Sequence, residues 1–187
     1  MLRNIYLIMG PSGSGKTTVA EKLCEKNDWR RVRSITSRPR RIGEAEDAYY
    51  FVSKREFVSR NDIIAPGYYA DNYYGTTLDE FNKSDLYILE PEGVRSIMTA
   101  SANIKPYRVI YLESSSESCL KNMCKRSDSE GKVKERLALD TKHFSKAKEL
   151  ADLVVPFADI DKVIALVESY IMYCEECYSD AGDKQVV

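Results

Sequence analysis

The residues best suited to chemistry lie near the amino terminus, in the run Gly10-Pro11-Ser12-Gly13-Ser14-Gly15-Lys16-Thr17. This run fits the pattern G-x-x-x-x-G-K-[ST] and follows the apolar run Ile5–Met9, so we expect a strand before it and a helix after it. Glycines let the backbone aim several N–H groups at one phosphate, and the helix adds its positive N-terminal end. The run therefore predicts a nucleoside triphosphate site.

Side-chain chemistry suggests separate roles within this loop. We expect Lys16 to reach the terminal phosphates and the Thr17 hydroxyl to ligate Mg²⁺. The predicted triphosphate-binding residues are Gly10, Pro11, Ser12, Gly13, Ser14, Gly15, Lys16, Thr17 and Thr18. The loop alone does not indicate which group receives a phosphate.

Arginine is concentrated in residues 30–41, which hold six of these side chains. Arg38 and Arg41 flank the stiff Pro39, and a guanidinium pairs with a phosphate through two parallel hydrogen bonds. Both are candidates for holding a second phosphate, and Glu44 is placed to orient one of them or to accept from a sugar hydroxyl. A solvated basic loop is the simpler interpretation for Arg30, Arg31 and Arg33.

A third group is Asn72-Tyr73-Tyr74-Gly75-Thr76-Thr77. Tyrosine offers a flat apolar face and a hydroxyl, which suits a base or a phosphate. Tyr74 is the candidate, whereas core or edge-strand positions are the better interpretation for Tyr68, Tyr69 and Tyr73.

Alternating apolar runs and helical patterns must position these groups. Strands are expected at Ile5–Met9, Tyr87–Leu89, Val109–Leu112 and Leu153–Val155, and helices at Lys16–Lys26, Glu92–Ala100, Ser116–Lys125, Val133–Leu150 and Asp161–Tyr173. This alternation predicts an α/β fold, a parallel sheet with helices on both faces. The segment 30–83 is rich in Arg and Tyr and is expected as a small β-rich insertion. Ligands of such sheets bind beyond the carboxyl ends of the strands.

Composition narrows the class of protein. At 187 residues, with 43% hydrophobic and 30% charged residues, the chain is sized for one globular domain. Its net charge of −1 provides no general attraction to nucleic acid or to anionic membranes. No apolar run approaches membrane-spanning length, and the first strand begins too early for a removable signal peptide, so a cytoplasmic location is expected.

The cysteines and the lone histidine give weak signals. Five cysteines fit reduced thiols, and Cys174-x2-Cys177 has no second pair at metal-binding spacing, so structural or surface thiols are expected. His143 lies in a charged helical pattern and is expected at the surface.

Taken together, these motifs resemble the guanylate kinase family. The resemblance rests on the glycine loop, on Arg38–Glu44 with Tyr49 and Phe51-Val52, and on Asn72–Thr76, in this order and spacing. It extends to Glu90–Val94, Lys125–Leu137 and Asp152–Lys162. It implies a P-loop kinase that uses MgATP to phosphorylate GMP or dGMP, with a core at about 1–29, 84–124 and 138–178, an acceptor-binding insertion at about 30–83 and a lid at about 125–137.

The resemblance also implies roles for single residues. The acceptor phosphate would be held by Ser34, Arg38, Arg41, Tyr49 and Tyr74. Glu44 would orient the arginines, Thr76 would contact the base, and Glu90 would serve the acceptor site or the water shell of Mg²⁺. Arg126 and Arg136, on either side of the loop Ser127–Gly131, would close over the transferring phosphoryl group. Arg126 occupies the place of a family glycine. This leaves open which cation of the lid contacts the transferring phosphoryl group as an arginine finger.

Two departures concern the bases. The family's guanine-reading glutamate corresponds to Ala65, and the asparagine near adenine corresponds to Phe157. The family glutamate accepts from two N–H groups of guanine, and hydrogen bonds to a charged group contribute about 1.5–3 kcal/mol each. Losing both bonds is expected to lower guanine preference by roughly two or more orders of magnitude. Asp71 or a backbone carbonyl near Tyr68 is a candidate replacement.

The sequence bears on three other functions. A related kinase with another acceptor, either a different nucleotide or a ribosyl phosphate, fits the loss at Ala65. A non-catalytic guanylate-kinase-like binding module is disfavoured by the complete glycine loop. A GTPase switch is disfavoured because no Asn-Lys-x-Asp motif occurs. The expected partners are small-molecule nucleotides, and the expected assembly is a monomer or a homodimer.

Overall fold

The four apolar runs expected as strands form one parallel sheet in the order β6-β1-β7-β8. Its strands are β1 (Ile5–Met9), β6 (Leu86–Ile88), β7 (Tyr107–Leu112) and β8 (Leu153–Val155). β1 lies between β6 and β7, with Tyr6 opposite Leu86 on one side and Arg108 on the other. All five β1 residues are buried, which is why this strand has no polar alternation.

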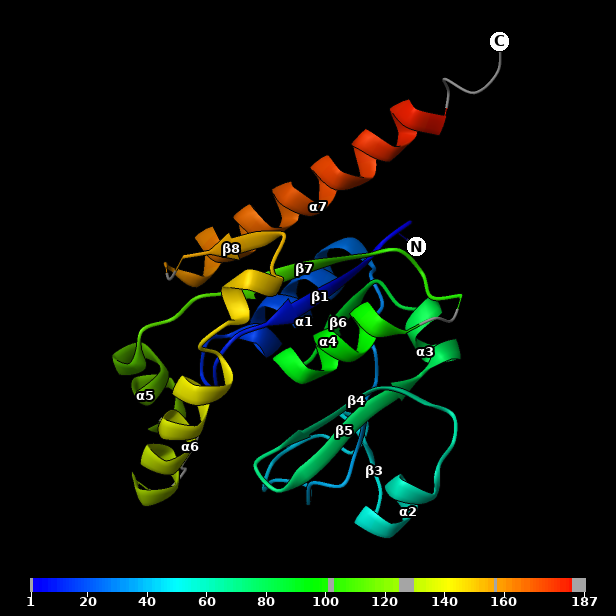
Figure 1. Cartoon of the computed structure of the whole chain (residues 1–187). Helices are drawn as coiled ribbons and strands as arrows, with labels where there is room; N and C mark the ends of the chain where they lie inside the picture. The colour runs from blue at the N-terminus through cyan, green and yellow to red at the C-terminus, as the bar shows by residue number, and fades with distance from the viewer. Residues whose placement is uncertain (1, 101–102, 125–129, 157, 183–187) are drawn as a thin grey trace.

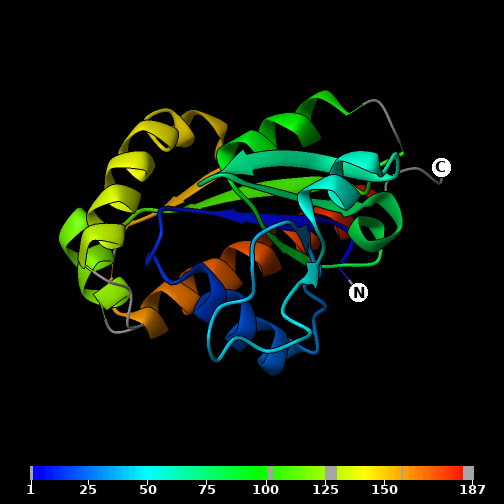
Figure 2. The same cartoon turned by 90° about the horizontal axis from the view of Figure 1, so that it is seen from below.

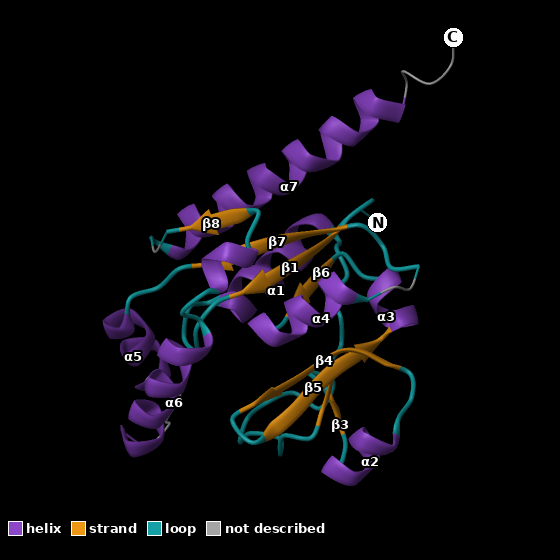
Figure 3. Ribbon diagram, in the orientation of Figure 1, coloured by secondary structure: helices purple, strands orange, loops and turns teal. Residues whose placement is uncertain are grey.

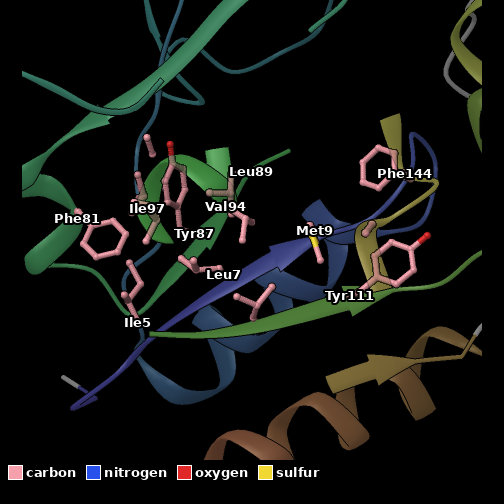
Figure 4. Packing of buried hydrophobic residues seen from close by; sticks show 14 residues of the cluster. Ile5, Leu7, Met9, Phe81, Tyr87, Leu89, Val94, Ile97, Tyr111 and Phe144 are labelled. Carbon is pink, nitrogen blue, oxygen red and sulfur yellow. The ribbon is translucent and has the colours of Figure 1, made fainter. Parts of the chain in front are cut away.

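Helices cover both faces of this sheet, which confirms the predicted fold class (Figure 1). The computed structural model describes residues 2–100, 103–124, 130–156 and 158–182. Tyr6 and Ile8 pack with α1 (Lys16–Asn27) and α7 (Ile160–Gly182). Ile5, Leu7 and Met9 point to the opposite face, where α4 (Pro91–Thr99) and the 3₁₀ helix η1 (Ala147–Leu150) contribute Val94, Ile97 and Ala147 (Figure 4).

A second sheet lies within the segment that was expected to be β-rich (Figure 3). Its order is β3-β2-β5-β4, built from β2 (Ile35–Thr36), β3 (Tyr50–Phe51), β4 (Ile63–Tyr69) and β5 (Asn72–Thr77). Two short helices, α2 (Lys54–Ser59) and α3 (Leu78–Asn82), belong to the same segment. The β4–β5 register shifts between Ile64 and Gly67, and Ala65 within this irregularity has φ 50°.

Two further helices, α5 (Ser116–Cys124) and α6 (Glu130–His143), lie beyond the carboxyl end of β1 (Figure 2). They pack together through Cys119, Met123 and Val133. The helix predicted to run to Leu150 instead ends at His143 and is followed by η1, while α7 continues past the predicted Tyr173 to Gly182. Lys125–Ser129 of the predicted lid lie outside the described residues.

None of the described helices is both long enough and apolar enough to cross a bilayer.

Candidate active site

The glycine loop is held in a tight turn between β1 and α1. Gly13 has φ 81° and Gly15, at the N-cap of α1, has φ 90°. A Cβ at Gly13 would lie 2.6 Å from the carbonyl oxygen of Cys119, and the Asn122 amide donates to the Gly13 carbonyl at 2.8 Å. The loop therefore requires glycine at position 13 both for its backbone conformation and for close packing against α5.

Lys16, the first residue of α1, contacts this loop through its side chain. Its ammonium donates to the carbonyl oxygens of Gly10 at 2.5 Å and Pro11 at 3.0 Å. Burial lowers the pKa of Lys16, and the carboxylates of Glu90 and Asp140 oppose that shift. A bound phosphate would act in the same direction as these carboxylates, because a nearby negative charge favours the protonated amine.

One cavity joins the glycine loop to the second sheet. Three loop residues, Ser12, Gly13 and Gly15, line it together with Lys16 and Thr17 of α1. The predicted acceptor-binding residues that line the same cavity are Ser34, Arg38, Arg41, Tyr49, Tyr74 and Glu90, and Arg136 of α6 lines it as well. The structure thus brings together predicted donor, acceptor and lid residues that are far apart in the sequence.

Glu44 orders the arginine-rich loop. Its carboxylate accepts from the Arg38 guanidinium at 2.7 Å and from the Arg41 backbone N–H at 3.0 Å. Burial opposes ionisation, yet these two hydrogen bonds hold the pKa of Glu44 below its usual value. The Arg38 guanidinium also lies 5.3 Å from the centre of the Tyr49 ring. Glu44 does not line the cavity itself. It affects the cavity through the hydrogen bonds that position Arg38 and Arg41.

Positive charge accumulates where the acceptor segment meets α6. Burial lowers the pKa of Arg41, and the nearby cations Arg136 and Arg38 lower it further. Mutual repulsion of this kind is relieved when an anion binds among the guanidinium groups. The cluster is therefore suited to a phosphate.

Glu90 brings a carboxylate into the same cavity at the N-cap of α4. Its buried Oε2 has no hydrogen-bond partner among the residues that the structure describes. Burial raises the pKa of Glu90 to about 7, although Lys16 opposes the shift. A buried carboxylate oxygen without a donor is available to a ligand N–H group or to hydrated Mg²⁺.

Some predicted residues are not among those that line this cavity. These are Gly10, Pro11, Ser14, Thr18, Glu44 and Thr76. Within the described part of the chain, the buried hydroxyl oxygens of Ser14 and Thr76 have no hydrogen-bond partner. Arg126 and Phe157 lie outside the described residues, so their predicted roles stay predictions.

Tyr69 and Asp140 are functional candidates that the motifs do not indicate, and His143 lies elsewhere than predicted. Tyr69 is buried, as expected of a core tyrosine, but it also lines the cavity and donates to the buried carboxylate of Asp140. No motif marks Asp140; its only sequence signal is helical spacing from Arg136. His143 is not a free surface residue, because its side chain is 25% exposed and its ring meets Tyr69 edge-on, with centres 5.3 Å apart.

The guanine-reading position is the clearest departure. Ala65 lines the cavity, and Glu90 is the one carboxylate among the described lining residues. Asp71, considered as a replacement for the missing glutamate, instead pairs at the surface with Lys54 at 2.7 Å and with the Tyr68 hydroxyl at 2.5 Å. Asp71 therefore does not take that place in this structure.

The cysteines form no site in the described part of the chain. All five thiols are free, with Cys174 buried and Cys177 exposed. The described residues contain no group of three or more His, Cys, Asp or Glu side chains placed to hold a metal.

Comparison with known proteins agrees with this geometry. The guanylate kinase family model matches residues 2–173. The guanylate kinase of Mycoplasmoides gallisepticum is 30% identical over 179 residues, covering 90% of this chain and 91% of the relative. That of Mycoplasmopsis pulmonis is 33% identical over 161 residues, covering 79% and 80%. The crystal structure of guanylate kinase from Anaplasma phagocytophilum has the same fold, with a TM-score of 0.71 at 24% identity, covering 94% and 89% of the two chains. The chain belongs to the guanylate kinase family.

Proposed function

We propose that this protein transfers the γ-phosphoryl group of ATP to the phosphate of GMP or dGMP. The observation that carries the proposal is the single cavity lined by Lys16 and Thr17 on one side and by Arg38, Arg41 and Tyr74 on the other. An enzyme that transfers a phosphoryl group from one phosphorylated substrate to another needs both phosphate sites in one cavity. Family membership supports the kinase assignment.

The reaction requires positioning and positive charge more than proton transfer. The nucleophile is an anionic phosphate oxygen, so no general base has to activate it. Two polyanions must meet in line, and the barrier is lowered by cations arranged in advance around the transferring group. We assign Lys16 to the donor phosphates, Arg38 and Arg41 to the acceptor phosphate, and Arg136 to the group in transfer, because all four line the cavity.

We also propose that Mg²⁺ accompanies ATP and is held by the Thr17 hydroxyl. Thr17 lines the cavity directly after Lys16, and Mg²⁺ is usually held by one or two protein oxygens together with substrate phosphates and waters. The unpaired Oε2 of Glu90 fits a role in the water shell of this ion. When bound, Mg²⁺ supplies charge neutralisation on the phosphates.

Ala65 favours one alternative, a related kinase with a different acceptor. The position lines the cavity but offers only a methyl group, so guanine would be read by other groups or less strictly. Another nucleoside monophosphate or a ribosyl phosphate would meet the same arginine cluster. The arginine cluster does not distinguish these acceptors, because it would contact the phosphate group that all of them carry.

One assay distinguishes the guanylate kinase proposal from the alternative kinase and from a binding module. Coupled ADP release with MgATP would be measured against GMP, dGMP, the other nucleoside monophosphates and ribosyl phosphates. Selective turnover of GMP or dGMP is the expected result. Preference for another acceptor would support the alternative kinase. ATP binding without turnover of any acceptor would contradict the enzymatic proposal and favour a binding module.

We further infer a cytoplasmic location and a monomer or homodimer. All five cysteines are free, which suits a reducing compartment. Size-exclusion chromatography with light scattering measures the assembly directly.

A further inference from the structure

A buried carboxylate on α6 joins the glycine loop to the second sheet. Asp140 is 3% exposed, and its Oδ2 accepts from the Ser12 backbone N–H at 2.6 Å. Its Oδ1 accepts from the Tyr69 hydroxyl at the end of β4. The hydroxyls of Ser12 and Tyr69 are also 3.4 Å apart. Asp140 is thus bonded on one side to the proposed donor loop and on the other to the proposed acceptor sheet.

The charge of Asp140 has opposing effects in this site, because it favours the protonated form of Lys16 but lies close to where phosphates would bind. A carboxylate beside a phosphate-binding loop repels the phosphates that the loop must bind. Burying it carries a desolvation cost as well, offset here by two donors, an amide and a phenol. These two bonds also connect the glycine loop with the end of β4.

A second connection reinforces the first. The His143 ring, one turn further along α6, packs edge-on against Tyr69, and its Nδ1 lies 4.0 Å from the Glu92 carboxylate. The same carboxylate accepts from the Tyr68 backbone N–H at 3.3 Å. Neighbouring residues of β4 are therefore linked to α6 and α4 at two points.

Arg136 lies four residues before Asp140, and so on the same face of α6. It lines the cavity into which the glycine loop and the arginine cluster face. A helix is stiff over one turn. The hydrogen bonds that hold Asp140 against Ser12 and Tyr69 therefore also fix the position of the Arg136 backbone.

We propose that Asp140 and Tyr69 are positioning residues for phosphoryl transfer. Their hydrogen bond sets the spacing between the glycine loop, the acceptor sheet and the α6 helix that carries Arg136. This role rests on the proposed function, since it concerns the alignment of a donor and an acceptor in one cavity. Misalignment slows the chemical step more than it weakens the binding of either substrate.

The test compares Tyr69→Phe with Tyr68→Phe. Each removes one phenol–carboxylate hydrogen bond from β4, but the Tyr68 bond to Asp71 lies at the surface. Tyr69→Phe should lower kcat about tenfold or more, with the KM values for ATP and acceptor within about twofold of wild type. Tyr68→Phe should leave all three unchanged. Thermal unfolding establishes that each variant is folded. The stoichiometry of ATP binding, measured by calorimetry, establishes that all of the protein is able to bind nucleotide.

A double-mutant cycle supplies the second measurement. If the two side chains act through one bond, adding Tyr69→Phe to Asp140→Ala should lower kcat by less than about twofold. Losses that multiply, or a Tyr69→Phe variant with wild-type kcat, would overturn the proposal while leaving the proposed function intact. The acceptor used is whichever compound wild type phosphorylates in the panel. A wild-type protein that phosphorylates none would overturn both.

Discussion

At the scale of single residues, the site depends on cations that face the cavity. Lys16→Ala and Arg41→Ala should each lower turnover by at least about a hundredfold, because each removes charge arranged for the transition state. Turnover would be measured at saturating MgATP, and thermal unfolding would establish that the fold survives. Arg40→Ala is the matched control, because Arg40 belongs to the same run but pairs at the surface with Glu46 at 3.0 Å. Near-wild-type turnover of either site variant would contradict this assignment.

Glu90 gives a second residue-scale prediction, one of pH dependence. Burial raises its pKa to about 7 from 4.5, so between these values the folded chain holds a proton that the unfolded chain has lost. The contribution of Glu90 to stability therefore falls as pH rises from about 4.5 to 7. Glu90→Gln imitates the neutral acid and should stabilise the nucleotide-free protein by about 3 kcal/mol at pH 8. Most of that gain should be absent at pH 5.

Urea unfolding of wild type and Glu90→Gln at the two pH values, without nucleotide or Mg²⁺, measures this difference. A stabilisation that is the same at pH 5 and pH 8 would mean that Glu90 ionises normally in the folded protein.

At the scale of elements, the arginine-rich loop depends on Glu44 for its shape. Glu44→Gln keeps the size of the side chain but removes the charge that binds Arg38 and the Arg41 backbone. A hydrogen bond to a charged group contributes about 1.5–3 kcal/mol, so the acceptor KM should rise about tenfold or more. The KM for ATP should stay within about twofold of wild type, because the glycine loop is untouched.

Glu46→Gln is the control for this variant. Its carboxylate pairs with Arg40 in the same loop but is 91% exposed, and exposed ion pairs contribute little. Equal effects of Glu44→Gln and Glu46→Gln on the acceptor KM would indicate a general charge effect and contradict the ordering role of Glu44.

Elements whose signals are local could be predicted from the sequence. The glycine loop, β1 and α1 follow from a fixed pattern and an apolar run, and the parallel sheet follows from alternation. The end of α6 and the added length of α7 were predicted wrongly, since polar helical patterns give weak boundaries. Asp140 could not be identified as part of the site, because its partners Ser12 and Tyr69 are 128 and 71 residues away. Only the folded chain shows such pairings.

At the scale of the whole molecule, the two sheets contribute different residues to the cavity. The parallel sheet carries the glycine loop and Glu90 at the carboxyl ends of β1 and β6, as ligand sites in such sheets do. The second sheet and its loops carry Arg38, Tyr49 and Tyr74, and α6 carries Arg136. Each unit supplies only part of the cavity, so the complete site exists only in the assembled fold.

This division predicts how ligands stabilise the protein. If the proposed donor and acceptor sites are right, an adenosine–guanosine pentaphosphate would reach both of them and contact both sheets at once, whereas ADP or GMP would contact mainly one. A ligand at a hundredfold excess over its Kd stabilises by about 2.7 kcal/mol, which corresponds to a Tm increase of roughly 5–10 °C for a chain of this size. At equal concentration the bridging ligand should raise Tm more than ADP and GMP added together, because linking the ligands increases their effective concentration. Differential scanning fluorimetry measures all three shifts. A bridging ligand that raises Tm no more than ADP alone would mean that the acceptor site does not bind the guanosine end.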